Sequence, residues 1–450
     1  MNIEQVKEVY FLGIGGIGMS ALARFFKSRG CSVFGYDKTS TPLTIALEAE
    51  GMQIHYEEDV DLVPDGIDLV VYTPAVPKQH AEYQFFLENG YPILKRSQVL
   101  GLISSGYKTI GISGTHGKTT VTTLTAHLLH QSPTGVNAFL GGISKNYNSN
   151  LILSPQSQWV VAEADEFDRS FLQLFPQIAV VTSVDADHLD IYKNIQTLKD
   201  SFTKFIGQIK PGGQLIIKKG LSLDVIQHPG LKVYSYSIDQ QADFCIRNLR
   251  IKTGHYIFDL LLDGTVMKDV ELGLPGLFNV ENSIAASAAA WLAGATEDEI
   301  RKGLLSFTGV HRRFDTRINR KDLIYIDDYA HHPAELKACI NSVKHLYPDK
   351  KITGVFQPHL FSRTRDFADD FARSLELLDE VILLEIYPAR EEPIEGIDSK
   401  MLLNKINKTN KRICQNDELI EVLKSLKPEL LLTLGAGDID QFVKPIEESL

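Results

Sequence analysis

The sequence predicts an α/β protein of three domains, each built around a sheet of mostly parallel strands. Three observations support this prediction. Short apolar runs alternate with amphipathic helical stretches along the chain, which is typical of parallel sheets. Two of the runs lead through glycine-rich turns into helical patterns. The length of 450 residues accommodates two to four domains at about 100–200 residues each.

The first predicted domain comprises residues 1–105. It opens with a buried strand from Val9 that enters a glycine-rich turn ending at Gly18. Apolar residues at helical spacing follow, and a second strand over 32–36 ends at Asp37. The remaining predicted elements are a strand over 67–72, a helix over 83–88 and a linker at 104–106.

The second predicted domain comprises residues 106–309. A short strand over 109–113 leads into the segment GTHGKTT and then into an apolar helix that ends near His130. An alanine-rich helix over 282–292 lies near the end of this domain. We expect core strands over 159–162 and 178–182, then a more antiparallel group over 215–217, 233–236, 244–251 and 256–262.

The third predicted domain comprises residues 310–450. Apolar strands alternate with helical stretches there, as in the first domain. The predicted strands are 323–326, 352–356, 381–385 and 430–434.

Composition and charge exclude several classes of protein. The hydrophobic fraction is 44% and the charged fraction 23%, as in ordinary globular proteins. The net charge is −11 without a basic stripe, so we expect no nucleic-acid partner. The chain lacks a run of about 18 apolar residues, so no membrane insertion is expected. The four cysteines form no CxxC pair, which, without a signal peptide, predicts reduced thiols in a cytoplasmic protein.

The strongest motif is GISGTHGKTT at residues 111–120, between a predicted strand and a predicted helix. Backbone N–H groups of such a turn, together with the helix N-terminus, bind phosphate. Lys118 would neutralise the β- and γ-phosphate oxygens of ATP, and the Thr119 hydroxyl would ligate Mg²⁺. The strict P-loop pattern requires glycine at position 112, where this chain has isoleucine. A glycine-rich turn that arose by chance is the alternative.

A second glycine motif, GIGGIG at residues 13–18, also follows a strand and opens a helix. Asp37 ends the next strand, where a Rossmann fold places the acid that binds ribose. The motif alone fits a nicotinamide cofactor, another nucleotide pyrophosphate or a purely structural turn. A chain with this loop and an ATP loop has two nucleotide sites, which favours a ligase acting on a nucleotide-linked substrate over a dehydrogenase.

Acidic side chains follow two core strands of the second predicted domain. Glu163 is the first acid after one strand and is the preferred Mg²⁺ ligand. A solvated acidic loop is the alternative for three further acids, Asp165, Glu166 and Asp168. After the next strand, the sequence DADHLD places His188 among acids, where it is a metal ligand, a general base or a structural residue.

Histidine and arginine side chains follow two strands of the third predicted domain. The segments are DDYAHHP at 327–333 and FQPH at 356–359, followed by SRTR at 362–365. Ligand sites of α/β sheets lie at the corresponding edge. An arginine there binds a carboxylate through two parallel hydrogen bonds. Surface salt bridges are the alternative for this group.

Together these segments resemble the Mur ligases over the whole chain. The matching segments, in order, are GIGGIGMS, GTHGKTT, EADE, DADHLD, RRFD, DDYAHHP, FQPH with SRTRDF, EIYPAREEPI and LTLGAGDI. The resemblance implies a Rossmann-like UDP-binding domain, a central P-loop ATPase domain and a C-terminal Rossmann-like domain that binds an amino acid. It is strongest to the members that join L-alanine to UDP-N-acetylmuramate in peptidoglycan precursor synthesis.

The resemblance also implies cofactors and residue roles. ATP and Mg²⁺ or Mn²⁺ are the expected cofactors, with Lys118, His188 and His331 as catalytic residues. The metal would be held by Thr119, Glu163 and His188. The resemblance assigns ATP to Gly114, Thr115, Gly117, Lys118, Thr119, Thr120, Asn282, Arg313 and Asp328, the UDP substrate to Gly13, Gly15, Gly16, Ile17, Gly18, Asp37 and Thr73, and the amino acid to Tyr329, His331 and Arg363.

Three departures from the family pattern affect these assignments. Phe278 stands where the family usually has histidine, which concerns adenine packing. Leu360 stands where the FQPH segment often continues with arginine, so one proposed substrate contact is missing. No lysine matches the carbamylated lysine of some relatives, although three lie nearby, namely Lys193, Lys199 and Lys204.

The implied reaction has two steps, phosphorylation of the muramate carboxylate by ATP and attack of the alanine amine on the resulting acyl phosphate. Three alternatives remain open. They are a murein tripeptide ligase of the same family, a nicotinamide-dependent oxidoreductase and a non-catalytic ATP-binding module. For the assembly, we expect a monomer or a weak dimer.

Overall fold

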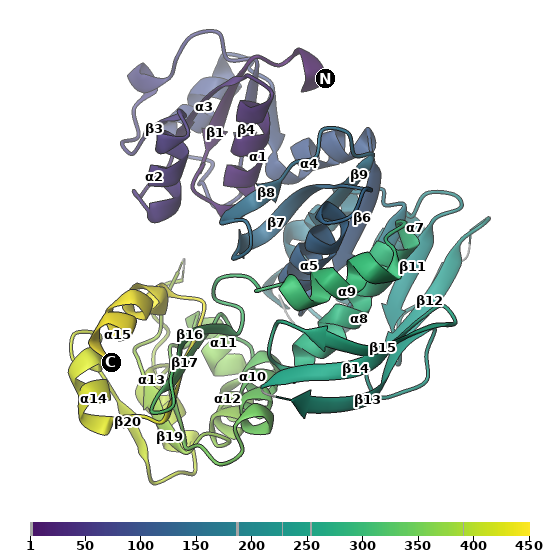
Figure 1. Cartoon of the computed structure of the whole chain (residues 1–450). Coiled ribbons are helices and arrows are strands. Elements are labelled where there is room, and N and C mark those ends of the chain that lie inside the picture. The colour runs from purple at the N-terminus through teal and green to yellow at the C-terminus, as the bar shows by residue number, and fades with distance from the viewer. Residues whose placement is uncertain (1–2, 186–188, 227, 253, 390) are drawn as a thin grey trace. The chain divides into compact units, whose positions relative to one another are not determined.

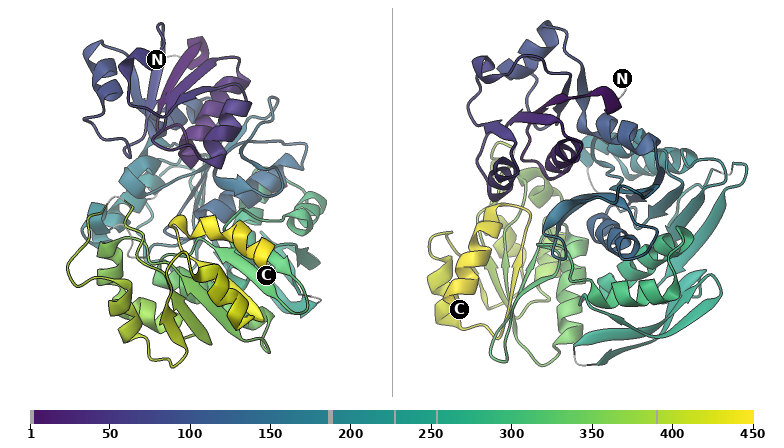
Figure 2. Two further views of the ribbon diagram at one scale, coloured as in Figure 1. Left: turned by 90° about the vertical axis from the view of Figure 1, so that its left-hand side faces the viewer. Right: turned by 45° about the horizontal axis from the view of Figure 1, so that its top comes forward.

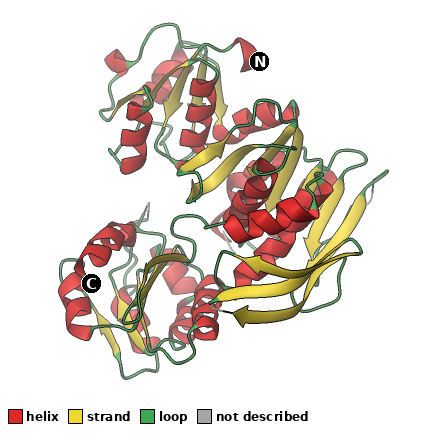
Figure 3. Cartoon of the chain, in the orientation of Figure 1, coloured by secondary structure: helices red, strands yellow, loops and turns green. Residues whose placement is uncertain are grey.

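The computed structural model describes residues 3–185, 189–226, 228–252, 254–389 and 391–450. It contains three sheets, each flanked by helices (Figures 1 and 3). The predicted three-domain α/β architecture is confirmed. The chain forms two compact units: residues 1–249, 258–271 and 282–307 make up unit 1, and the remaining residues make up unit 2. The predicted domain limits, 1–105, 106–309 and 310–450, stay predictions.

The first sheet belongs to unit 1 and has five parallel strands in the order β3-β2-β1-β4-β5. Its two faces are both covered, since Val9 and Phe11 pack with α1, whereas Tyr10 and Leu12 pack with Phe86 of α3. The elements are β1 (Glu8–Leu12), α1 (Ile17–Ser28), β2 (Ser32–Tyr36), α2 (Pro42–Ala49), β3 (Gln53–His55), β4 (Leu69–Tyr72), α3 (Ala81–Glu88), β5 (Ile93–Lys95) and α4 (Arg96–Ser105), with the short 3-10 turns η1 (Ile3–Gln5) and η2 (Val60–Leu62).

The direction of winding reverses beside β1, because β2 lies on one side of it and β4 on the other. Ligands of such open sheets bind at this switch point, outside the carboxyl ends of the strands. The glycine loop at residues 13–18 follows β1 at this place.

The second sheet has ten strands in the order β15-β14-β13-β12-β11-β10-β6-β9-β7-β8. Helix α5 follows β6 and packs against β7 and β9 (Figure 1). Most residues of α5 are buried. The elements are β6 (Lys108–Ser113), α5 (Lys118–His130), β7 (Asn137–Ser144), β8 (Ser149–Ile152), β9 (Trp159–Glu163), η3 (Phe167–Gln173), β10 (Ile178–Val181), α6 (Leu189–Tyr192), α7 (Ile195–Gly207), β11 (Gln214–Lys218), β12 (Lys232–Ser237), β13 (Phe244–Lys252), β14 (His255–Leu262), β15 (Thr265–Leu272), α8 (Leu277–Leu292) and α9 (Glu297–Ser306).

The third sheet belongs to unit 2 and has six strands in the order β16-β17-β21-β18-β19-β20. All its pairs are parallel except β16 with β17. Figures 1 and 2 show helices on both faces, α10, α12 and α13 on one and α14 and α15 on the other. The elements are β16 (Asp315–Asn319), β17 (Ile324–Asp328), α10 (Pro333–Leu346), β18 (Ile352–Phe356), α11 (Phe361–Asp366), α12 (Ala368–Leu375), β19 (Glu380–Leu383), α13 (Ser399–Lys405), β20 (Lys411–Ile413), α14 (Leu419–Leu426), β21 (Leu430–Leu434), η4 (Asp438–Phe442) and α15 (Val443–Ser449).

Several sequence predictions require correction. β11 and β12 were expected to be antiparallel, but β10, β11, β12 and the start of β13 pair in parallel. Residues 104–105 were expected in a linker, but α4 continues to Ser105, and Gly106 is its C-cap. Glu163, Asp327 and Asp328 end their strands rather than following them. Among the described residues, none of the helices has the length and hydrophobicity that a membrane span requires.

Candidate active site

The predicted ATP loop joins the end of β6 to the start of α5. Gly114 (φ +137°) and Gly117 (φ +83°) have backbone conformations that favour glycine. A Cβ atom on Gly114 would also lie 2.0 Å from Thr182 Oγ1. The loop therefore needs glycine at 114 and 117, whereas Gly111 is an ordinary strand residue within β6. Ile112 also lies within β6, paired with Glu163 of β9, so position 112 belongs to the strand and not to the loop.

Two side chains that follow β10 hold this loop. The Ser183 hydroxyl accepts a hydrogen bond from His116 N at 2.8 Å, and the Ser183 carbonyl accepts one from Thr115 N at 3.1 Å. The Thr182 hydroxyl donates to the His116 carbonyl at 2.5 Å. Sequence reasoning missed both residues. The signal available was a Thr-Ser pair directly after a core strand that neighbours the loop strand.

Lys118 is enclosed by acceptors. Its Nζ donates to the Gly114 carbonyl at 2.7 Å and to Glu166 Oε1 at 2.9 Å. The Glu166 side chain is fully buried. The main-chain carbonyl of Glu166 accepts a hydrogen bond from the Tyr192 hydroxyl at 2.5 Å. The sequence left Glu166 as a candidate for a solvated acidic loop, and the structure corrects this to a buried partner of Lys118.

The charges of this pair depend on each other. Burial disfavours the charged form of Lys118 and by itself would lower its pKa. The carboxylates of Glu166, Asp165 and Glu163 have the larger effect, so the pKa of the Lys118 ammonium is raised. Burial also raises the pKa of the Glu166 carboxyl, although Lys118 counteracts the shift. Lys118 therefore stays protonated, as binding of polyphosphate requires.

Glu163 ends β9 and faces Gly141 of β7. A Cβ atom on Gly141 would lie 1.9 Å from Glu163 Oε2, so the missing side chain of Gly141 provides the space that the carboxylate occupies. Carboxylate and hydroxyl oxygens, as on Glu163 and Thr119, are hard donors that suit Mg²⁺. Within the described ranges no three His, Cys, Asp or Glu side chains form a metal-binding group. A Mg²⁺ ion shared with nucleotide phosphates and water needs only one or two such protein ligands.

Of two other residues predicted for the ATP and metal site, the structure describes Asn282 but not His188. Asn282 of α8 lies over the ATP loop, because a Cβ atom on Gly117 would be 2.8 Å from Asn282 Oδ1. His188 lies outside the described residues, so its predicted metal-binding and catalytic roles stay predictions.

The first glycine loop brings together several residues assigned to the UDP substrate. Asp37 Oδ2 accepts a hydrogen bond from Gly15 N at 2.8 Å. Gly13 has φ +84°, and a Cβ atom there would lie 2.7 Å from the Thr73 methyl group. The carboxylate of Asp37 thus contacts the loop itself.

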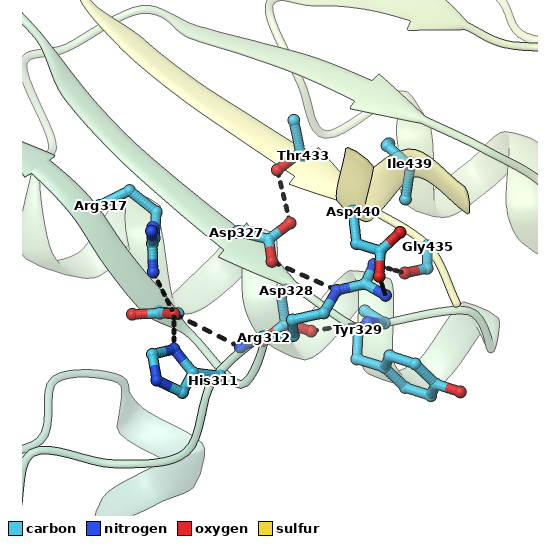
Figure 4. A network of polar contacts seen from close by, with 12 residues as sticks. His311, Arg312, Arg317, Asp327, Asp328, Tyr329, Thr433, Gly435, Ile439 and Asp440 are labelled. Carbon is cyan, nitrogen blue, oxygen red and sulfur yellow. Dashed lines mark hydrogen bonds and ion pairs between the residues drawn. The ribbon is translucent and has the colours of Figure 1, made fainter. Parts of the chain in front are cut away.

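In unit 2, Asp328 organises the segment that begins at His311 (Figure 4). Asp328 is buried, and its two carboxylate oxygens accept hydrogen bonds from Phe314 N at 2.6 Å and Ala330 N at 2.7 Å. Burial raises the pKa of Asp328 to about 7, against the opposing effects of Arg313 and these two N–H groups. Asp328 therefore fixes the turn that carries Arg313.

Tyr329 is covered by two arginines of this turn. The guanidinium carbons of Arg312 and Arg313 lie 5.2 and 4.8 Å from the centre of its ring. Arg312 also donates to the Gly435 carbonyl at 2.7 Å and lies 3.4 Å from Asp327 Oδ2 (Figure 4). The ring of Tyr329 is thus held in one position.

A row of rings continues from Tyr329. His331 lies edge-on to Tyr329 and to His359, with ring centres 5.2 and 5.8 Å apart, and His359 stacks on Tyr387 at 5.7 Å. Glu335 Oε2 lies 3.4 Å from His331 Nδ1. Arg363 of α11 is largely buried, with 9% of its surface exposed. The DDYAHHP and FQPH segments thus meet as predicted, and Tyr387 is an addition that sequence reasoning missed.

Replacing Asp328 with asparagine should lower the free energy of unfolding by about 1–3 kcal/mol. An asparagine side chain has one acceptor oxygen, so its NH₂ group would face one of the two N–H donors. Urea unfolding measures the effect, with Asp349→Asn, an exposed site of unit 2, as the control. Equal stability of the two variants would show that the two N–H bonds contribute nothing.

Three family models match consecutive parts of the chain. The model for the Mur ligase family, catalytic domain, matches residues 8–108. The Mur ligase middle domain matches residues 112–290. The model for the Mur ligase, glutamate ligase domain, matches residues 312–437.

Individual proteins are similar over the full length. UDP-N-acetylmuramate–L-alanine ligase of Parabacteroides distasonis is 50% identical over 455 residues, which cover 100% of this chain and 98% of that protein. The enzyme of the same name from Phocaeicola vulgatus is 51% identical over 452 residues, covering 99% and 98%. The crystal structure of UDP-N-acetylmuramate-alanine ligase from Thermotoga maritima matches with a TM-score of 0.83 at 27% identity, covering 99% of both chains.

Proposed function

This chain belongs to the Mur ligase family, and we propose that it joins L-alanine to UDP-N-acetylmuramate with conversion of ATP to ADP and phosphate. The observation that carries the proposal is the pair of glycine-rich loops in unit 1, one after β1 and one after β6. One loop suits the pyrophosphate of a nucleotide-linked substrate and the other suits ATP. The names of the full-length relatives support the same substrates.

The reaction starts from a carboxylate, which is a poor acyl donor because oxide would have to leave. An oxygen of the muramate carboxylate attacks the γ-phosphorus of ATP, and the bond to the β-phosphate oxygen breaks to release ADP. The alanine nitrogen then attacks the carbonyl carbon of the acyl phosphate, the new C–N bond forms, and phosphate leaves. The amine loses a proton to a base in this step.

Lys118 acts in the first step, where charge on the γ-phosphoryl oxygens must be neutralised. Glu166 orients the Lys118 ammonium through an ion pair in which Lys118 Nζ lies 2.9 Å from Glu166 Oε2. Thr119 and Glu163 would hold Mg²⁺ or Mn²⁺, which when bound supplies further positive charge to the phosphates. Asn282, beside Gly117, would contact the nucleotide.

Residues of unit 2 act in the second step. Arg363 would grip the carboxylate of alanine, since a guanidinium matches a carboxylate in two parallel hydrogen bonds. His331, held between Tyr329 and His359 and near Glu335, would accept the proton of the amine. The rigid ring of Tyr329 would limit the size of the amino-acid side chain.

We expect Arg363→Lys to raise the KM for L-alanine at least roughly tenfold, because charge-assisted hydrogen bonds contribute about 1.5–3 kcal/mol and lysine lacks the planar fork. The KM for ATP should change little. Arg373→Lys, on an exposed face of α12, is the matched control. An unaltered KM for alanine in a stable Arg363→Lys protein would exclude the clamp and favour Arg365 instead.

Phosphate release from ATP tests the function as a whole. With UDP-N-acetylmuramate present, release should require L-alanine within a panel of amino acids. Release with the tripeptide L-Ala-γ-D-Glu-diaminopimelate alone would identify a murein peptide ligase. An NADH absorbance change without phosphate release would identify an oxidoreductase, and neither signal would indicate a binding module.

We place the protein in the cytoplasm, because its four cysteines are all free and buried, as in chains from reducing compartments. A monomer or weak dimer remains our expectation, and sedimentation would measure it.

A further inference from the structure

Helix α1, which follows the first glycine loop, packs on the hairpin formed by β7 and β8 of the second sheet (Figure 1). The ring of Phe25 in α1 lies 5.6 Å from the ring of Phe139 in β7, measured between their centres, and both side chains are buried. The apolar core of the first sheet thus continues into that of the second sheet at this contact.

Asn150 of β8 adds polar contacts to this packing. It is fully buried, and its Nδ2 donates to the Ile17 carbonyl at 2.6 Å and to the Ser20 hydroxyl at 2.8 Å. Its Oδ1 accepts a hydrogen bond from Arg24 Nη1 at 2.5 Å. A guanidinium only donates and a carbonyl only accepts, so these partners define the orientation of the amide. Both N–H donors of the amide are therefore directed to the first turn of α1.

The arginine that donates to Asn150 is itself fixed by a carboxylate. Nε and Nη2 of Arg24 donate to Glu50 at 3.0 and 2.7 Å, which leaves Nη1 directed at the Asn150 oxygen. A buried amide is stable only when its donors and acceptor have partners. Because all the partners of Asn150 named here lie on α1, the amide is satisfied in one position of α1 against β8.

The same hairpin is joined to the strand that carries the candidate metal ligand. Phe139 of β7 is paired with Leu151 of β8 on one side and with Ala162 of β9 on the other. Ala162 directly precedes Glu163, the residue that we assign to Mg²⁺. The strand pairing therefore connects Asn150, next to Leu151, with the end of β9.

We propose that Asn150 is a positioning residue, which fixes the start of α1, and with it the glycine loop at residues 13–18, relative to Glu163 and the ATP loop. This inference rests on the proposed function, in which the substrate bound at one loop must meet ATP bound at the other. The muramate oxygen must approach the γ-phosphorus in line, and a displacement of about 1 Å can reduce the rate about 10²-fold. Asn150 acts here through the backbone of Ile17 and the side chain of Ser20.

Asn150→Leu in the full chain tests the proposal, because leucine has a similar size and makes none of the three hydrogen bonds. At saturating UDP-N-acetylmuramate, ATP and L-alanine, phosphate release should fall roughly 10–100-fold. The dissociation constants for UDP alone and for a non-hydrolysable ATP analogue alone should stay at the parent values, since each loop keeps its own residues. A slower reaction with both affinities unchanged is the result of lost alignment, which a residue that only supports the fold would not produce.

Asn137→Leu is the matched control. Asn137 is a buried amide at the start of β7, and its Oδ1 accepts a hydrogen bond from Ser154 N at 3.0 Å. Ser154 follows β8 and is not part of α1, so this variant perturbs the same hairpin and should release phosphate at the parent rate. Thermal unfolding of both variants establishes that they are folded at the assay temperature.

Phosphate release at the parent rate by a folded Asn150→Leu protein would overturn the positioning role and leave the proposed function intact. An equal loss in Asn137→Leu would also overturn it, because damage to the hairpin would explain both results. Weaker UDP binding with undiminished release at saturation would assign Asn150 to binding and overturn its role in alignment. A parent protein that releases no phosphate with the three substrates would overturn the proposed function as well.

Asn150→Asp keeps the test decisive if Asn150→Leu does not fold. Aspartate has the same shape and retains the acceptor for Arg24, but it lacks both donors to the first turn of α1. It should show the same loss of phosphate release with unchanged affinities. Release at the parent rate by a folded Asn150→Asp protein would count against the proposal.

Discussion

Lys118→Ala is expected to reduce turnover by roughly 10²–10³-fold, the effect of losing one preorganised electrostatic contact to a transition state. Lys118 is the cation that we propose for the ATP phosphates, and its ammonium is oriented by hydrogen bonds to the Gly114 carbonyl and to Glu166. Phosphate release at saturating substrates measures the loss.

Because Glu166 is the buried partner of Lys118, Lys118→Ala also affects stability. A second variant is therefore needed to separate loss of activity from loss of stability. Lys118→Ala leaves the buried Glu166 carboxylate without its ammonium, and breaking a buried pair in this way costs about 3–5 kcal/mol of stability. The double variant Lys118→Ala/Glu166→Gln removes both charges and should recover much of the stability while remaining inactive. Recovery of turnover in the double variant would contradict the role of Lys118.

Gly141→Ala is expected to raise the Mg²⁺ concentration for half-maximal activity about 10–100-fold, the range seen when groups that orient metal ligands are altered. The methyl group added at position 141 would lie only 1.9 Å from Glu163 Oε2 and would therefore clash with the carboxylate. The carboxylate is the flexible end of a side chain, so it should turn away while the fold survives. Binding of Mn²⁺ in the presence of a non-hydrolysable ATP analogue gives a readout independent of turnover.

Gly106→Ala is the control for Gly141→Ala. Gly106 has φ −78° as the C-cap of α4, and the nearest atom to an added Cβ would be Ile103 O at 3.8 Å. This variant should keep normal metal binding. Normal Mn²⁺ affinity in Gly141→Ala as well would argue against Glu163 as a metal ligand.

The glycine loops were predictable from the sequence because their chemistry is local. Gly114, Gly117 and Lys118 lie within five consecutive residues. A strand before them and a helix after them can be predicted from apolar periodicity. The helical pattern after Gly18 and the strand ending at Tyr36 were predictable for the same reason.

Features that depend on long-range pairing were not predictable. The sequence of β11 and β12 indicates strands but not which neighbour each one joins, so their parallel pairing was missed. Glu166 reads as one acid among several, and only the folded chain shows that it is buried against Lys118. Gly141 and Glu163 are 22 positions apart by number, and their contact depends on β7 and β9 lying side by side.

The contact between Lys118 and Glu166 bears on which anions the ATP loop attracts. Without Glu166, the Lys118 ammonium would attract orthophosphate or sulfate, including the phosphate that the proposed reaction releases. Because Glu166 cancels that charge, a small dianion gains little by entering the loop. We expect a triphosphate, which can contact more of the loop than orthophosphate can, to compete better with the Glu166 carboxylate for Lys118.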